Sequence, residues 1–246
     1  MFIAGTRPEA VKLAPLLLDL QTRGHCPLLV ATGQHREMFD EALAGFGLQA
    51  DHDLGVMAAS PDTVVGRLVP ALADVVRETR PAWVVVQGDT SSTLAGALAA
   101  RYAGARLAHV EAGLRSGDRT MPEEINRMVT DSITDHFFTT SEIANTNLRN
   151  AGVPEEKIHF VGNTMIDTLL AQQPRFTKPQ GSPFDQLLPK EYFVVTLHRP
   201  ANVDNEESIR KLMEAILDGT AGLPLIFPVH PRTAKNLERL GISAPN

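Results

Sequence analysis

The stretch WVVVQGD, residues Trp83–Asp89, indicates the fold most directly. A tryptophan and three valines follow one another without a polar interruption, and the run ends on Gln-Gly-Asp. A short apolar run bounded by a turn signal is typical of a parallel strand that is covered on both faces. We therefore expect a buried strand here, with Asp89 just beyond its carboxyl end.

Strands and helices alternate on both sides of this run. Further strands are predicted at Met1–Ala4, Leu28–Ala31, Leu107–Val110, His136–Thr140 and Ile158–Val161. Helical spacing of apolar residues predicts helices over Pro61–Thr79 and Thr93–Tyr102, helices that begin near Arg36 and Pro122, and a helix that ends near Asn150. The alternation predicts an α/β fold, with a Rossmann-like, doubly wound parallel-sheet domain over residues 1–171.

The character of the chain changes over residues 172–189. This segment holds four prolines and a glycine without periodicity, which is typical of a linker. A new strand-helix series follows over residues 190–246, with strands at Tyr192–Leu197 and Leu225–Val229. Because two such units are too few for a stable open sheet, we expect a second Rossmann-like domain that is incomplete.

Composition narrows the class of protein. A formal net charge of −6 over 246 residues argues against nucleic acid or an anionic membrane as a partner. No targeting signal or membrane-spanning apolar run stands out, so we expect a cytoplasmic protein. The single cysteine, Cys26, excludes an intramolecular disulfide, and its apolar neighbours predict a buried thiol.

Charged side chains gather where the predicted strands end, which is where parallel α/β sheets bind ligands. The richest segment is HVEAGLRSGDRTMPEEINR, residues His109–Arg127, with Glu111 at a strand end and Glu123 at the start of a helix. Carboxylates beside arginines suit proton transfer next to a bound anion. The helix carries an apolar face that includes Ile125, and a plain surface ion pair between Glu123 and Arg127 is the alternative explanation of their spacing.

Other strand ends also allow two interpretations. Arg7 and Lys12 lie at the start of the first helix, where free amides can hold an anion, although an ordinary capped helix fits equally. Asp89 either takes part in chemistry or caps a tight turn. His198 and His230 lack the spacing of a metal site, so we expect no metal and a phosphate, proton-transfer or capping role for each.

Together these motifs resemble the UDP-N-acetylglucosamine 2-epimerase family of the bacterial, non-hydrolysing type. In family order they are GTRPE (Gly5–Glu9) with Lys12, TGQHREMFD (Thr32–Asp40), VQGDTSST (Val86–Thr93), the segment His109–Arg127, FVGNTMIDTL (Phe160–Leu169), TLHRPANVDN (Thr196–Asn205) and FPVHPRT (Phe227–Thr233). They cover nearly the whole chain. Family members continue past Asn246, which again implies an incomplete second domain.

The resemblance implies two Rossmann-like domains of the glycosyltransferase-B type with a nucleotide-sugar cleft between them. It implies interconversion of UDP-GlcNAc and UDP-ManNAc by elimination of UDP across C1–C2 and its re-addition, with proton exchange at C2. No cofactor or metal is implied. A homodimer and a place in the synthesis of wall or surface polysaccharide precursors are the further expectations.

Site residues are carried over motif by motif. The implied catalytic residues are Asp89, Glu111, Glu123 and His198; the implied substrate-binding residues are Arg7, Lys12, Arg127 and His230; and a regulatory UDP-GlcNAc site would use Gln34, His35 and Arg67.

Three other functions stay open on the sequence. A hydrolysing relative would release UDP and free ManNAc. A glycosyltransferase of similar architecture would need an acceptor, and the paired acids Glu111 and Glu123 weigh against it. A non-catalytic half-protein would bind a nucleotide sugar without turning it over.

Overall fold

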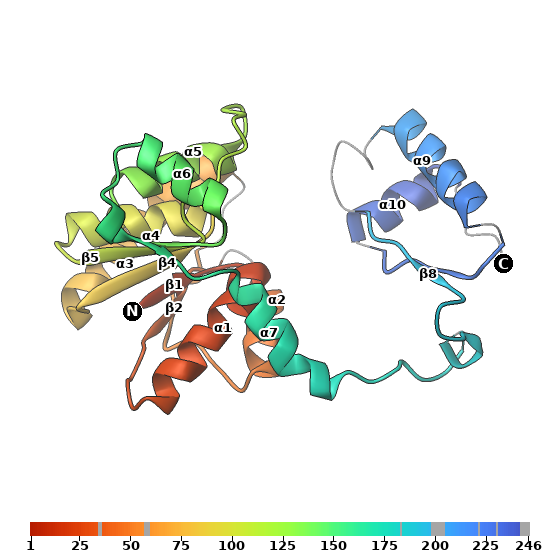
Figure 1. Ribbon diagram of the computed structural model, residues 1–246, viewed down its shortest axis with the longest axis horizontal. Coiled ribbons are helices and arrows are strands. Elements are labelled where there is room, and N and C mark those ends of the chain that lie inside the picture. Colours follow the sequence, from red (N-terminus) through yellow and green to blue (C-terminus); the bar gives the residue numbers. More distant parts are fainter. Residues whose placement is uncertain are drawn as a thin grey trace. The chain divides into compact units, whose positions relative to one another are not determined.

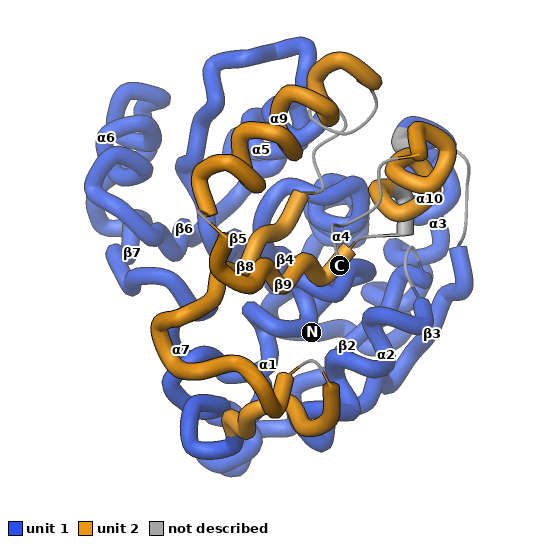
Figure 2. Tube along the Cα trace, turned by 90° about the vertical axis from the view of Figure 1, so that its right-hand side faces the viewer, with its two compact units in different colours: residues 1–175 blue, residues 176–246 orange. Residues whose placement is uncertain are grey.

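The computed structural model describes residues 1–33, 36–56, 60–182, 184–197, 205–220, 222–229 and 231–241. The chain divides into two compact units, Met1–Arg175 and Phe176–Asn246 (Figure 2). The first unit holds the strand ends that carry most of the predicted site.

Seven parallel strands form the centre of the first unit, in the order β3-β2-β1-β4-β5-β6-β7 (Figure 1). The strands are β1 (Phe2–Ala4), β2 (Leu29–Ala31), β3 (His52–Asp53), β4 (Trp83–Gln87), β5 (Arg106–Val110), β6 (His136–Thr139) and β7 (Ile158–Phe160). The helices are α1 (Arg7–Thr22), α2 (Arg36–Gly45), α3 (Pro61–Thr79), α4 (Ser91–Tyr102), α5 (Pro122–Ser132), α6 (Glu142–Asn150) and α7 (Thr164–Gln172), with 3-10 turns η1 (Glu155–Lys157) and η2 (Gln173–Arg175). The strand order reverses between β1 and β4, the position at which such sheets bind ligands.

Neighbouring residues of β1 point into two different cores. Ile3 packs with residues of α3 and α4 on one face of the sheet, including Leu68 and Leu72. Phe2 and Ala4 pack with residues of α1 and α2 on the other face. Helices on both faces of a parallel sheet confirm the predicted doubly wound α/β class.

Strand β4 departs from the expectation that both of its faces are covered. Val84 and Val86 are fully buried under α3 and α4, whereas Trp83 and Val85 are only half-buried. Trp83 meets the ring of His136 edge-on at 5.3 Å, and an apolar pocket of about 580 Å³ lies beside both rings. This face is therefore covered only in part: Val85 packs against the core that α1 and α2 form, but it stays half-buried.

Among the strands and α-helices of the first unit, β3 and α7 have no counterpart in the sequence-based prediction. β3 is only two residues long, too short for a periodic pattern to show. The prediction of a buried thiol was also wrong, since Cys26 is exposed. It lies in the loop between α1 and β2, ahead of the first buried residue of that strand, so its apolar neighbours do not enclose it.

The second unit contains a two-stranded parallel sheet in its described part, β8 (Phe193–Val194) beside β9 (Leu225–Ile226). Its helices are α9 (Glu206–Gly219) and α10 (Pro231–Arg239), preceded by the 3-10 turn η3 (Phe184–Gln186). Ile209 and Met213 of α9 form a small core with partly buried residues such as Phe227. Across the described residues of both units, no helix combines the length and the apolarity needed to cross a membrane.

Gly113, in the loop after β5, is a position where an added side chain has no room. Its φ is +79°, and a Cβ would lie 2.5 Å from the carbonyl oxygen of Ala144. We expect Gly113→Ala to lower the free energy of unfolding by about 2–4 kcal/mol, because left-handed strain adds to a clash with backbone. Gly117 is the matched control, since its φ is +78° but nothing lies within 4 Å of its Cβ position. Urea denaturation measures both variants, and equal losses would show that the clash contributes nothing.

Candidate active site

Glu111 follows the last residue of β5 and meets two side chains from other elements. Its Oε2 accepts a hydrogen bond of 2.5 Å from Lys12 Nζ of α1 and one of 2.7 Å from Gln87 Nε2 of β4. Both Glu111 and Lys12 are only 19% exposed. Within the described ranges, no hydrogen bond reaches the other carboxylate oxygen, Oε1. Among the described residues, the carboxylate is therefore held through one of its two oxygens.

The backbone of Glu111 is strained, with a φ of +68° in the left-handed region. This conformation is uncommon for a residue with a side chain and costs on the order of 1–3 kcal/mol. The amides of Glu111 and Ala112 both donate to the carbonyl oxygen of Phe138, at 2.9 and 3.1 Å, and these bonds hold the turn. Strain of this kind persists at sites where a side chain must point in one direction.

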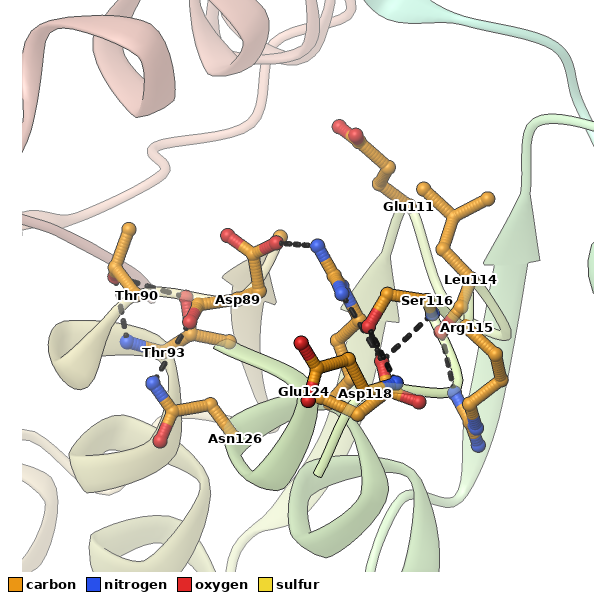
Figure 3. A network of polar contacts seen from close by, with 12 residues as sticks. Asp89, Thr90, Thr93, Glu111, Leu114, Arg115, Ser116, Asp118, Glu124 and Asn126 are labelled. Atoms are coloured by element: carbon orange, nitrogen blue, oxygen red, sulfur yellow. Dashed lines mark hydrogen bonds and ion pairs between the residues drawn. The ribbon is translucent and has the colours of Figure 1, made fainter. Parts of the chain in front are cut away.

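Asp89 lies beyond the end of β4, next to the strand that carries Glu111. Its carboxylate accepts a hydrogen bond from Arg127 of α5. Its carbonyl oxygen accepts one of 2.8 Å from Asn126 Nδ2 (Figure 3). The alternative that Asp89 caps the following helix was wrong. Thr90 caps α4 instead, where its hydroxyl accepts from the amide of Thr93 at 3.1 Å.

Helix α5 turns its polar side toward these loops. Its buried residues are Glu124, Asn126, Thr130 and Asp131, whereas Ile125 of the predicted apolar face is 42% exposed. The alternative explanation, a surface ion pair between Glu123 and Arg127, was wrong, since Arg127 bonds Asp89 and Glu124. Glu124 lies three residues before Arg127 on the same helix, but spacing along the helix could not reveal Asp89, which lies in the loop after β4.

Glu124 of α5 accepts several hydrogen bonds from the loop after β5. Its Oε2 accepts from the amide of Ser116 at 2.8 Å, its Oε1 accepts from the amide of Gly117 at 3.1 Å, and Arg127 Nη1 donates to Oε2 at 3.1 Å. Burial alone would raise the pKa of Glu124, but the two amides, Arg127 and the Ser116 hydroxyl together lower this pKa to about 2. Glu124 thus binds the loop to the helix more strongly in its ionised form.

Lowering the pH should weaken the hydrogen bonds between Glu124 and the loop after β5. A carboxyl with a lowered pKa stabilises the fold above its ordinary pKa of 4.5, and the contribution is lost as the pH falls toward about 2. We expect the free energy of unfolding of the unaltered protein to decline over this range, and the slope to be shallower in Glu124→Gln. Chemical denaturation at a series of pH values measures the slope. Glu123→Gln, an exposed neighbour in the same turn, should keep the original slope, and an unchanged slope in Glu124→Gln would contradict the assignment.

Glu9 is a buried carboxylate whose hydrogen-bond donors, within the described part of the chain, are all neutral. Its Oε2 accepts from the amides of Gly5 and Thr6 at 3.0 and 2.8 Å and from the Thr6 hydroxyl at 2.8 Å. Its Oε1 accepts from the hydroxyls of Thr90 and Thr93, at 2.8 and 3.3 Å. Burial raises the pKa of Glu9, and these hydrogen bonds oppose the rise. Glu9 thus connects the loop after β1 with the start of α4, which follows β4. The order of strands reverses between β1 and β4.

The remaining predicted site residues are not all brought together. Arg7, the first residue of α1, is exposed, as is Glu123 near the start of α5. Arg67 lies on an exposed position of α3. Four predicted residues lie outside the described residues: Gln34, His35, His198 and His230.

Comparison with known proteins agrees with the resemblance in the motifs. The family model described as UDP-N-acetylglucosamine 2-epimerase matches residues 19–245. A UDP-N-acetylglucosamine 2-epimerase of Methanococcus maripaludis is 38% identical over 251 residues, which covers 98% of this chain and 67% of the relative. A UDP-2,3-diacetamido-2,3-dideoxy-D-glucuronate 2-epimerase of Pseudomonas aeruginosa is 37% identical over 253 residues, covering 98% and 69%.

Comparison with a solved structure supports the same family on the basis of the fold. The UDP-GlcNAc 2-epimerase of Methanocaldococcus jannaschii, in complex with UDP-GlcNAc and UDP, matches with a TM-score of 0.84 and 36% identity, over 98% of this chain and 68% of that one. This chain thus spans about two thirds of the length of its relatives. On the family match, the identities and the shared fold, the chain belongs to the UDP-N-acetylglucosamine 2-epimerase family.

Proposed function

We propose that the protein interconverts UDP-GlcNAc and UDP-ManNAc as a non-hydrolysing 2-epimerase. One observation carries the proposal beyond family membership. Asp89 and Glu111 follow the neighbouring strands β4 and β5, and each carboxylate is bonded to a cation, Arg127 and Lys12 respectively. A reaction that moves a proton and separates a charged diphosphate requires acids and cations side by side.

The first half of the reaction removes UDP. A carboxylate takes the proton from C2 of the sugar, the electrons of that bond form the C1=C2 double bond, and the C1–O bond breaks with its electrons going to UDP. The products are 2-acetamidoglucal and UDP. Glu111 is suited to proton transfer because Lys12 and Gln87 both bind its Oε2, and among the described residues neither they nor any other donor uses Oε1.

The second half returns the proton to the opposite face of C2, and an oxygen of UDP attacks C1. Two faces require two groups, and Asp89, Glu111 and Glu123 come from three separate segments of the chain. His198 is the fourth proposed catalytic residue and would assist departure of the diphosphate.

The cations have donors to spare for the diphosphate. A lysine offers three N–H donors and an arginine five. Lys12 and Arg127 can therefore keep their carboxylates and still bind phosphate oxygens. Arg7, exposed at the start of α1, and His230 complete the proposed substrate-binding set.

The proposal includes several further features that the sequence predicts. They are an N-terminal domain over residues 1–171, a linker over residues 172–189, a partial second domain over residues 190–246, a homodimer, a cytoplasmic location and the supply of polysaccharide precursors. A regulatory UDP-GlcNAc site at Gln34, His35 and Arg67 is also proposed.

Product analysis tests the proposed activity. The protein is incubated with UDP-GlcNAc, and the nucleotide sugars are separated by chromatography. We expect UDP-ManNAc to accumulate to an equilibrium that is also reached from UDP-ManNAc. Free ManNAc with UDP would show the hydrolysing reaction instead, and binding without turnover would show a binding protein. Turnover of only a 2,3-diacetamido uronic acid substrate would assign the specificity of the Pseudomonas relative.

Arg127→Ala should release UDP from the reaction. Loss of one charge-assisted hydrogen bond weakens retention of a diphosphate by about 1.5–3 kcal/mol, so free UDP per UDP-ManNAc formed should rise about tenfold or more. A coupled assay for UDP measures this ratio. Arg149→Ala is the control, because Arg149 forms ion pairs on the exposed surface with Glu142 and Glu155. An unchanged ratio in Arg127→Ala would leave Arg127 as a structural partner of Asp89 and Glu124.

A further inference from the structure

His109 is a fully buried histidine on β5, two residues before Glu111. Its Nδ1 lies 2.7 Å from Oδ1 of Asp131, a residue of α5. Its Nε2 lies 2.8 Å from the carbonyl oxygen of Gly88, the residue before Asp89. Because it is 0% exposed, its ring cannot touch a substrate.

The partners of His109 fix its protonation. A carbonyl oxygen only accepts hydrogen bonds, so Nε2 must carry a proton to bond Gly88. Asp131 is also an acceptor, since its Oδ2 receives a bond of 2.6 Å from Arg115 Nη1 and one of 3.2 Å from the amide of Gly113. With Asp131 ionised, its Oδ1 accepts as well, so Nδ1 donates to it and the ring carries a proton on both nitrogens.

The state of Asp131 agrees with this assignment. Burial alone would raise the pKa of Asp131, but the bonds and charges of His109 and Arg115 lower it. The pair is thus a buried imidazolium and a carboxylate, and its charges are compensated within the core. A buried charge of either sign without such a partner would be costly.

The backbone connections of this pair reach all three proposed acid/base carboxylates. Gly88 has a φ of +74° and leads into Asp89, so the bond from His109 sets the turn that aims that carboxylate. Glu111 directly follows β5, the strand that holds His109, and Glu123 lies on the same helix as Asp131. Asp131 also holds the amide of Gly113, two residues beyond Glu111.

Building on the proposed epimerase function, we propose that His109 and Asp131 are positioning residues that hold Asp89, Glu111 and Glu123 in one working arrangement. The pair joins β5, the loop after β4 and the helix α5 at a single buried point. Misplacement of a reacting group by about 1 Å costs up to 100-fold in rate, so loss of the pair acts on turnover rather than on binding.

The kinetic test uses His109→Gln and Asp131→Asn in the full chain. We expect kcat for epimerisation of UDP-GlcNAc to fall about 10- to 100-fold, whereas KM and the affinity for UDP change by less than about threefold. Rates are expressed per UDP-binding site, so that unfolded protein does not count. His136→Gln is the control: His136 is a half-buried histidine of the neighbouring strand that bonds His159 and meets Trp83, outside the proposed site. A proportional loss of UDP binding and kcat, or no loss of kcat, would overturn the proposal.

A second measurement does not depend on activity. In the unaltered protein with ¹⁵N-labelled histidine, NMR near neutral pH should show one ring with protons on both nitrogens, absent from His109→Gln. The amide signal of Glu123, on the far side of the pair, should also move in that variant. An unprotonated nitrogen on His109, or an unmoved Glu123 signal, would overturn the positioning role. If the unaltered protein fails to epimerise UDP-GlcNAc while both NMR results hold, the proposed function fails and the arrangement of the pair stands.

Discussion

Replacing Glu111 with glutamine is expected to lower the rate of epimerisation by about 100-fold or more, the scale of losing a general acid or base. Glutamine keeps an oxygen in place of Oε2, so Lys12 and Gln87 can still donate to it. The fold should therefore survive, and what is lost is the ability to exchange a proton. Steady-state formation of UDP-ManNAc measures the effect.

Glu123→Gln is expected to cause a loss of the same order, since the proposed reaction needs a group on each face of C2. Glu142→Gln is the matched control, because Glu142 is an exposed carboxylate on α6 that pairs with Arg149. Its rate should stay within about twofold of the unaltered protein. Near-normal rates in both Glu111→Gln and Glu123→Gln would refute the acid/base assignment.

Glu9→Ala is expected to cause the largest loss of stability, about 3–5 kcal/mol. The change removes the acceptor for five donors in a region where Glu9 is 1% exposed. The threonine hydroxyls can rotate to new partners, but the amides of Gly5 and Thr6 cannot. Buried donors without partners cost about 1–3 kcal/mol each, so these two amides account for most of the loss.

Urea denaturation measures the effect of Glu9→Ala. Glu9→Gln should lose less, because its amide oxygen still accepts from part of the set. Glu41→Ala, at an exposed position of α2, is the control and should change the free energy of unfolding by no more than about 0.5 kcal/mol. A loss for Glu9→Ala as small as that of the control would show that water replaces the carboxylate at no cost.

The sequence predicted the order of strands and helices well, because apolar runs such as Trp83–Asp89 and helical periodicity are local properties. It failed where burial depends on other segments. How fully the second face of β4 is covered depends on α1 and α2, and Cys26 is exposed because the loop that carries it lies ahead of β2. Neither fact can be predicted from the residues next to these positions in the sequence.

The site shows the same division. Glu111 and Asp89 could be found because charged residues at strand ends meet at one edge of a parallel sheet. Glu9 carried a usable signal, since the spacing Thr6 to Glu9 is that of a capping box, and the structure contains that box. The hydrogen bond between His109 and Asp131 joins residues 22 positions apart, and no local sequence pattern predicts it.

The exchange of the C2 proton tests the central claim most directly. The protein is incubated with UDP-GlcNAc in D2O, and proton NMR follows the signal of C2. The account predicts that this signal disappears from UDP-GlcNAc while UDP-ManNAc appears with deuterium at C2. UDP-ManNAc that retains the original proton, or a C2 signal that persists while the protein binds the substrate, would contradict it.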